Sequence, residues 1–158
     1  MEGKPVRESV SEYSELALPN DANGLGNVLG GKVMHLVDLA AALAGLRHAR
    51  LPIVTAALDS MRFLHPVKIG QLIVLRSSVN RVFHTSMEVG VKVETETLLT
   101  GEKLHTCSAY LTFVAVDAKG RPVPIPPVIP ETEEEQRRYR EAGERREYRL
   151  AVGRDARA

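Results

Sequence analysis

The feature that most constrains the fold is a change of hydrophobic period at Pro52. From Gly30 to about Arg50, apolar residues recur at steps of three and four, which is typical of a helix, and alanine dominates its second half. After Pro52 the period becomes two, and strand-length segments rich in Val, Ile, Leu and Thr follow at 53–64, 71–83, 85–98 and 103–116. With an extended segment before the helix, at residues 6–18, this order predicts an α+β fold in which one helix lies against one curved antiparallel sheet.

Turn residues connect the last four strand segments, so we expect these strands to follow one another as an antiparallel meander. A chain of 158 residues can build one real core, but not two ordinary domains. We expect a core domain over residues 1–121, a proline-rich extended connector over 122–130, and a charged helix and tail over 131–158. The acidic residues of that helix come first and its arginines later, as the helix dipole favours.

Composition excludes several classes of protein. The formal net charge is +1, so the chain has no basic field to hold nucleic acid or an anionic membrane. The single Cys107 rules out an intramolecular disulfide framework and is expected to be buried packing, and no Cys/His cluster has zinc spacing. The chain starts without the apolar stretch of a secretory signal, and its most apolar stretch, 36–46, is too short to span a membrane. We therefore expect a cytoplasmic protein without a metal.

A carboxylate, Asp38, stands in the middle of the most apolar helix. Burying it costs several kcal/mol unless it has partners. Asp38 therefore either lies at the edge of the buried stripe, where His35 one turn earlier could pair with it, or is kept for chemistry.

Gly30 and Gly31 stand where the predicted helix begins, and the first N–H groups of a helix have no partner within it. Such groups can stabilise an oxyanion, although a glycine pair is also an ordinary tight turn. Eight residues of helix span about 12 Å. These donors and Asp38 could therefore bracket an ester or thioester arm.

The segment 18–38, LPNDANGLGNVLGGKVMHLVD, resembles the start of hotdog-fold acyl-CoA thioesterases. The nearest similarity is to bacterial short-chain acyl-CoA thioester hydrolases and mammalian cytosolic long-chain acyl-CoA hydrolases. Segments 60–70 and 110–117 are similar to later strands of the same family, and the resemblance covers about residues 8–148. It implies a hotdog fold, in which a curved antiparallel five-stranded sheet wraps one long central helix, with an added C-terminal helix. It also implies hydrolysis of acyl-CoA to a carboxylic acid and coenzyme A without a metal or organic cofactor.

The resemblance also implies roles for individual residues. Asp38 would be the general base or the nucleophile, Asn23 would position the water or the carbonyl oxygen, and the backbone N–H groups of Gly30 and Gly31 would form the oxyanion hole. In this family Asn23 and Asp38 would come from different subunits. Two hotdogs would pair edge to edge, and three such dimers often form a hexamer, so a homohexamer is expected.

Coenzyme A requires basic side chains for its phosphates and a strand edge for its pantetheine amides. The candidates for these contacts are Arg62, His65, Lys68, Arg81, Thr85 and Ser86. Arginines of the C-terminal helix could also reach the phosphates, or that helix could be solvated or a subunit contact. Two other functions remain as alternatives, a non-catalytic acyl-CoA-binding sensor and a hotdog dehydratase, which pairs a helix Asp with a His in a different motif.

Overall fold

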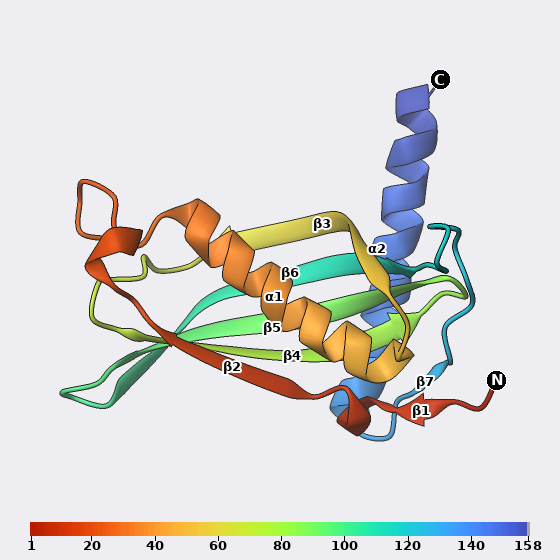
Figure 1. The fold of residues 1–158 in the computed structure, drawn as a ribbon, viewed down its shortest axis with the longest axis horizontal. Helices are drawn as coiled ribbons and strands as arrows, with labels where there is room; N and C mark the ends of the chain where they lie inside the picture. Colours follow the sequence, from red (N-terminus) through yellow and green to blue (C-terminus); the bar gives the residue numbers. More distant parts are fainter. Residues whose placement is uncertain (158) are drawn as a thin grey trace.

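One long helix, α1 (Gly30–Ala49), lies against one face of a five-stranded antiparallel sheet (Figure 1). The computed structural model describes residues 1–157, and their side chains as far as residue 154. The sheet consists of β2 (Ser11–Leu16), β3 (Ile53–Phe63), β4 (Leu72–Val82), β5 (Ser86–Thr97) and β6 (Glu102–Ala115). The predicted α+β class, with one long helix against an antiparallel sheet, is confirmed.

The strand order is β2-β4-β5-β6-β3, so the predicted four-strand meander is wrong at its first strand. β4, β5 and β6 do follow one another through hairpins, but β3 pairs with β6 and not with β4. The reason is that α1 carries the chain across the sheet between β2 and β3, which makes these two strands the opposite edges. Residues 64–71 then return the chain to the place beside β2.

The segments before and after the sheet contain short elements of their own. Residues 6–18 form a single 3-10 turn (Val6–Glu8) and the short β2, because the Ser9 N–H and hydroxyl both bond the Val6 carbonyl and close the turn. A second 3-10 turn spans Pro19–Asp21. The connector 122–130 contains β7 (Val128–Ile129), which pairs in parallel with β1 (Lys4–Pro5). The connector is thus packed against the body of the protein.

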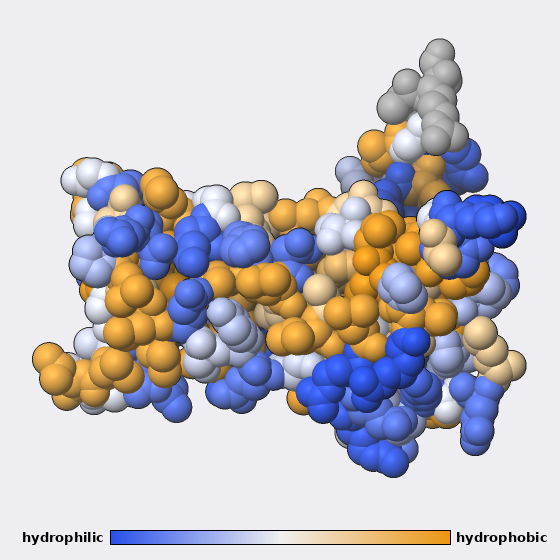
Figure 2. All heavy atoms as spheres, in the orientation of Figure 1, coloured by the Kyte–Doolittle hydropathy of each residue, from blue (hydrophilic) through white to orange (hydrophobic). Residues whose placement is uncertain are grey.

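The core lies between α1 and the sheet. The buried stripe of α1 consists of Val33, Leu36, Val37, Ala40, Ala41 and Ala44, as the helical period predicts. Gly45 brings the helix close to the sheet, since a Cβ there would lie 2.8 Å from Met87 Cε and 2.9 Å from Ile53 Cδ1. The other side of α1 carries exposed leucines, and Figure 2 shows hydrophobic side chains in a band that follows the helix.

A second helix, α2 (Glu133–Arg157), crosses the opposite, outer face of the sheet (Figure 1). Its first turn is acidic, as predicted, and the last residue of the predicted tail, 158, lies outside the described residues. Within residues 1–157 we find no helix long and apolar enough to cross a membrane.

Candidate active site

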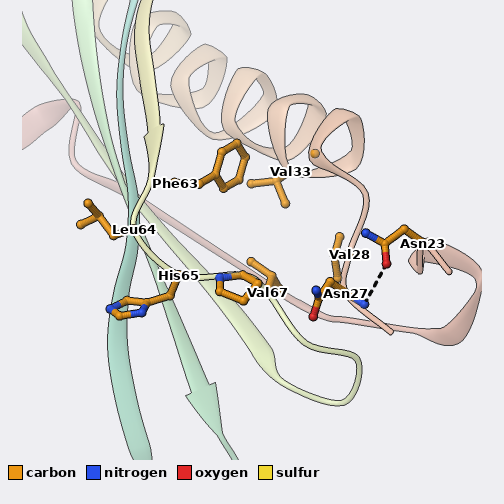
Figure 3. A pocket seen from close by; sticks show the side chains of 10 residues that line it. Asn23, Asn27, Val28, Val33, Phe63, Leu64, His65 and Val67 are labelled. Carbon is orange, nitrogen blue, oxygen red and sulfur yellow. Dashed lines mark hydrogen bonds between the residues drawn. The ribbon is translucent and has the colours of Figure 1, made fainter. Parts of the chain in front are cut away.

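A pocket of about 380 Å³ opens at the N-terminal end of α1 (Figure 3). It brings together three residues predicted from the sequence: Asn23, Gly30 and His65. The rest of its wall is mainly apolar and comes from the loops before α1 and after β3: Asn27, Val28, Val33, Phe63, Leu64, Pro66 and Val67. The pocket can therefore hold an apolar group beside a few polar ones.

Asn23 enters this pocket with its hydrogen-bond donors available. Its Oδ1 accepts the N–H groups of Leu25 at 2.8 Å and of Asn27 at 3.2 Å, which ties the 22–28 loop together. Since the oxygen is occupied by these donors, the Nδ2 end faces the pocket (Figure 3). Asn23 can thus donate to a carbonyl oxygen or to the oxygen of a water molecule.

The first turn of α1 supplies further donors at the same end. The N–H groups of Lys32 and Val33 bond the Leu29 carbonyl, whereas those of Gly30 and Gly31 have no acceptor among the described residues. Leu29, at the N-cap, provides no side-chain cap. A Cβ at Gly30 or Gly31 would meet no atom within 4 Å, so a ligand can approach these N–H groups closely.

Asp38 lies two turns further along α1, against the edge strand β3. The Thr55 hydroxyl donates to its Oδ1 at 2.9 Å. Thr55 is opposite Phe113 in the β3–β6 register, on the face of the sheet that α1 covers. Asp38 does not pair with His35, which was the expected alternative, because its carboxylate accepts a hydrogen bond from Thr55 of β3 instead.

Within a single chain, Asp38 and the pocket remain apart. Asp38 is not among the described residues that line the pocket, although α1 connects the two. Thr55 and Phe63 lie eight positions apart on β3, a distance of about 26 Å along a strand. The structure thus has two separate groups of candidate residues, named half-sites here: one with Asn23 and the helix N-terminus, the other with Asp38 and Thr55.

Comparison with known proteins shows the family of the chain. The sequence model of the thioesterase superfamily matches residues 25–102. YkhA of Bacillus subtilis, an uncharacterised acyl-CoA thioester hydrolase, is 43% identical over 129 residues, which are 82% of this chain and 75% of that protein. The chain belongs to the hotdog-fold acyl-CoA thioesterases.

Solved structures of the family match nearly the whole chain. A hexameric acyl-CoA thioesterase, solved in its apo form, is 42% identical with a TM-score of 0.94, over 97% of this chain and 98% of that one. An acyl-CoA hydrolase of Staphylococcus aureus, in complex with butyryl coenzyme A and coenzyme A, is 32% identical with a TM-score of 0.90, over 98% of this chain and 94% of that one. Variants of that enzyme with one Asp, one Asn or one Thr replaced by alanine have also been solved.

The residues predicted to bind coenzyme A fall at two ends of this thioesterase. His65 and Lys68 are exposed on the loop after β3 and line a second groove of about 540 Å³ next to the pocket. Arg62 is exposed on β3 close to them. This end of the molecule therefore offers exposed positive charge near the pocket.

The other three candidates lie at the far end of the sheet. The Arg81 guanidinium is stacked 4.1 Å from the ring centre of Tyr139 and donates to its carbonyl, and Ser86 Oγ accepts from Arg146. Thr85 is in the turn between β4 and β5. In one chain these three residues stand at the opposite end of β4 from Lys68, and two of them are engaged by α2. Their contact with coenzyme A stays a prediction.

Cys107 has no catalytic geometry. It is completely buried in the core, as expected, and burial raises the pKa of its thiol, which keeps it protonated. Among the side chains of residues 1–154, no three from His, Cys, Asp or Glu are grouped to hold a metal ion. The residue that sequence analysis missed is Thr55, whose only signal was its position on a strand face pointing toward α1.

Proposed function

We propose that this thioesterase hydrolyses acyl-CoA to a carboxylic acid and coenzyme A without a metal or organic cofactor. Asp38 removes a proton from a water molecule that attacks the thioester carbonyl, or attacks the carbonyl itself. In the first route the proton passes to Asp38, and the C–S bond then breaks to release the coenzyme A thiolate. In the second route the C–S bond breaks as the acyl group forms a mixed anhydride with Asp38, and water then hydrolyses the anhydride to the carboxylic acid and free Asp38. The observation that carries the proposal is the Asp38 carboxylate, fixed by Thr55 at 2.9 Å, on the helix whose N-terminal donors face an apolar pocket.

The half-site around Asn23 stabilises the negative charge that develops on the carbonyl oxygen of the thioester. The Gly30 and Gly31 N–H groups and Asn23 Nδ2 are donors placed before substrate arrives, so they cost no reorganisation as the carbonyl oxygen becomes an oxyanion. The apolar wall of the pocket excludes water and strengthens these hydrogen bonds.

Two copies of the chain complete each site in our proposal. β3 is a long edge strand, and an unpaired edge of this length favours pairing with another chain. If two β3 strands pair antiparallel about their midpoint, Leu58, then Thr55 of a second copy comes opposite Met61, two positions from Phe63. The Asp38 half-site of one copy thereby approaches the Asn23 half-site of the other. Three such dimers would form the expected hexamer.

The spacing in a relative supports these assignments. Asn23, Asp38 and Thr55 are separated by 15 and 17 positions, as are the Asn, Asp and Thr that were replaced in the S. aureus enzyme.

The antiparallel pairing of two β3 strands also reverses the strand direction of one sheet relative to the other. It would bring Thr85 and Ser86 of one copy to the same end as His65 and Lys68 of the other, so all could contribute to one coenzyme A site.

The test is thiol release from acyl-CoA by Asp38→Asn, with Asp117→Asn, a remote turn carboxylate, as the matched control. We expect the turnover of Asp38→Asn to fall by about 10²–10⁴ and that of the control to stay unchanged. Thr55→Val should lower turnover by about 10-fold or more, since a hydrogen bond to a charged group is lost. Undiminished turnover in Asp38→Asn would refute the role of Asp38. Tight acyl-CoA binding without turnover by the unmodified protein would favour the sensor.

Mixing two inactive variants tests the shared site. In a mixed dimer of Asn23→Ala and Asp38→Ala, one of the two shared sites keeps both residues. Random exchange makes half of the dimers mixed, so about a quarter of the original activity should return. If each site lies within one chain, the mixture stays inactive.

A further inference from the structure

The side chain of Lys32, in the first turn of α1, lies between two carboxylates of the segment that precedes the helix. Its Nζ is 3.5 Å from Glu15 Oε1 on β2 and 3.8 Å from Asp21 Oδ1 in the second 3-10 turn. All three side chains are partly buried, so water and salt screen these ion pairs less than they screen a surface pair. Glu15 Oε2 is buried and has no hydrogen-bond partner among the described residues, so this carboxylate depends on the charge of Lys32.

Asp21 connects this ion pair to Asn23, which follows two positions later. Its Oδ2 accepts the Leu18 N–H at 3.2 Å, and its carbonyl oxygen accepts the N–H of Leu29, the N-cap residue of α1, at 2.8 Å. The other carboxylate oxygen, Oδ1, is the one that faces Lys32. Asp21 thus holds the base of the loop that carries Asn23 at the first turn of the helix.

The tip of the same loop has little support from the rest of the protein. Leu25 is 85% exposed, and a Cβ at Gly24 or Gly26 would meet no atom within 4 Å. The two hydrogen bonds that Asn23 Oδ1 accepts fix the shape of the loop, but both donors belong to the loop itself. The place of Asn23 relative to α1 must therefore be fixed from the base of the loop, where Asp21 lies.

We propose that Lys32 is a positioning residue, which acts through Asp21 on Asn23. The ion pair keeps Asn23 Nδ2 in one geometry with the free N–H groups in the first turn of α1. The inference rests on the proposed function, in which these donors bind the developing oxyanion. Such donors act strongly only when they are placed before the charge forms, and a displacement of about 1 Å can cost about 10²-fold in rate. Lys32 itself is not among the described residues that line the pocket, so it has no contact with the substrate in this proposal.

The first experiment measures kcat and KM for acyl-CoA with Lys32→Met, which keeps the length of the side chain and removes its charge. We expect kcat to fall about tenfold and KM to stay within about twofold, because the donors bind the oxyanion more strongly than the carbonyl oxygen of bound substrate. Asp21→Asn removes the same charge pair from the other side, keeps an oxygen for the Leu18 N–H, and should give the same result. An unchanged kcat in both variants overturns the proposal.

Two further variants separate this role from a general effect of losing a lysine. Lys32→Arg can still pair with both carboxylates, so it should keep at least about half of the original kcat. Lys92→Met is the matched control, since Lys92 is an exposed lysine of β5 at 3.3 Å from Glu94, and its kcat should stay unchanged. A kcat for Lys32→Arg as low as that of Lys32→Met, or an equal loss in the control, overturns the proposal.

Combining Lys32→Met with Asn23→Ala tests whether Lys32 acts through Asn23. The residual rate of Asn23→Ala is measured in single turnovers with enzyme in excess over acyl-CoA. Because a positioning residue has no further effect once its target is gone, adding Lys32→Met should lower this rate by less than about twofold. A second loss of about tenfold overturns the proposal, since Lys32 would then act by another route. If Asn23→Ala alone keeps full turnover, the role of Asn23 in the proposed function is wrong, and this inference with it. If Asn23→Ala lowers turnover and Lys32→Met does not, only the role of Lys32 is wrong.

Discussion

The ion pair between Glu88 and Arg145 is the attachment of α2 whose loss we expect to be most costly. Glu88 is 1% exposed on the outer face of β5, and it accepts Arg145 Nε at 3.0 Å, Arg145 Nη2 at 2.6 Å and Asn80 Nδ2 at 2.9 Å. Burial on its own lowers the pKa of Arg145, but the hydrogen bond and charge of Glu88 raise it above its ordinary value. Arg145 therefore stays charged at neutral pH.

Arg145→Met keeps the aliphatic stem and removes the charge. Glu88 would remain buried with one hydrogen bond, from Asn80, in place of three. Leaving a buried charge without its partner costs about 3–5 kcal/mol. Arg145 is 24% exposed, so solvent screens part of the interaction, and we expect about 3 kcal/mol in the free energy of unfolding. The assay is urea unfolding followed by circular dichroism.

The double variant Glu88→Gln with Arg145→Met separates the pair from its surroundings. If the cost of Arg145→Met comes from the orphaned carboxylate, removing that charge should return most of the lost stability. A loss below about 1 kcal/mol for Arg145→Met would refute the reasoning, because it would mean that Glu88 reaches water or another cation. A double variant as unstable as Arg145→Met would show that the stacking of Arg145 on Tyr110, and not the charge pair, stabilises the helix.

Two further predictions concern the packing of α1. His48 is fully buried, with its ring Nε2 at 2.7 Å from the Pro126 carbonyl oxygen, and burial lowers the pKa of this imidazole below 6.5. As the pH falls below 6.5, the unfolded state therefore takes up the proton before the folded state does. The free energy of unfolding should then decrease by at most about 1.4 kcal/mol per pH unit, and His48→Gln should flatten this slope in urea titrations at pH 5.5–7.5. Gly45→Ala should cost about 1–3 kcal/mol, since its Cβ would press on Met87 and Ile53, and a stability equal to the original would contradict that close approach.

The local elements could be predicted because each has a period of its own. The helix ending before Pro52 and the strands after it follow from steps of 3.6 and two residues, and the observed bounds differ by at most one position. The partner of β3 could not be predicted, because its side-chain pattern suits β4 and β6 equally well. Only the path of α1 across the sheet decides that β3 lies beside β6.

The residues of the candidate site also divide into those that local sequence signals indicate and those that only tertiary contacts bring in. Asn23, Gly30 and Asp38 were found from local signals and the resemblance, whereas Thr55 contacts Asp38 across 17 positions and belongs to another element. Likewise Glu88 alternates with the apolar Met87 and Val89 of β5, which is typical of a solvent-exposed position, but the covering α2 buries it. A pattern within one strand reports which face a side chain takes, not what later lies on that face.

The pairing of β3 with β6 also has a consequence for synthesis. While the ribosome adds residues in order, β3 emerges long before the strand that it needs, and β4 and β5 appear in between. The hairpins β4–β5 and β5–β6 join neighbours in the chain, so they form with little loss of loop entropy. β3 and the apolar stripe of α1 stay unsheltered until residues 102–115 have left the exit tunnel. In this interval a nascent chain is exposed to chaperones and to the β3 of other nascent chains.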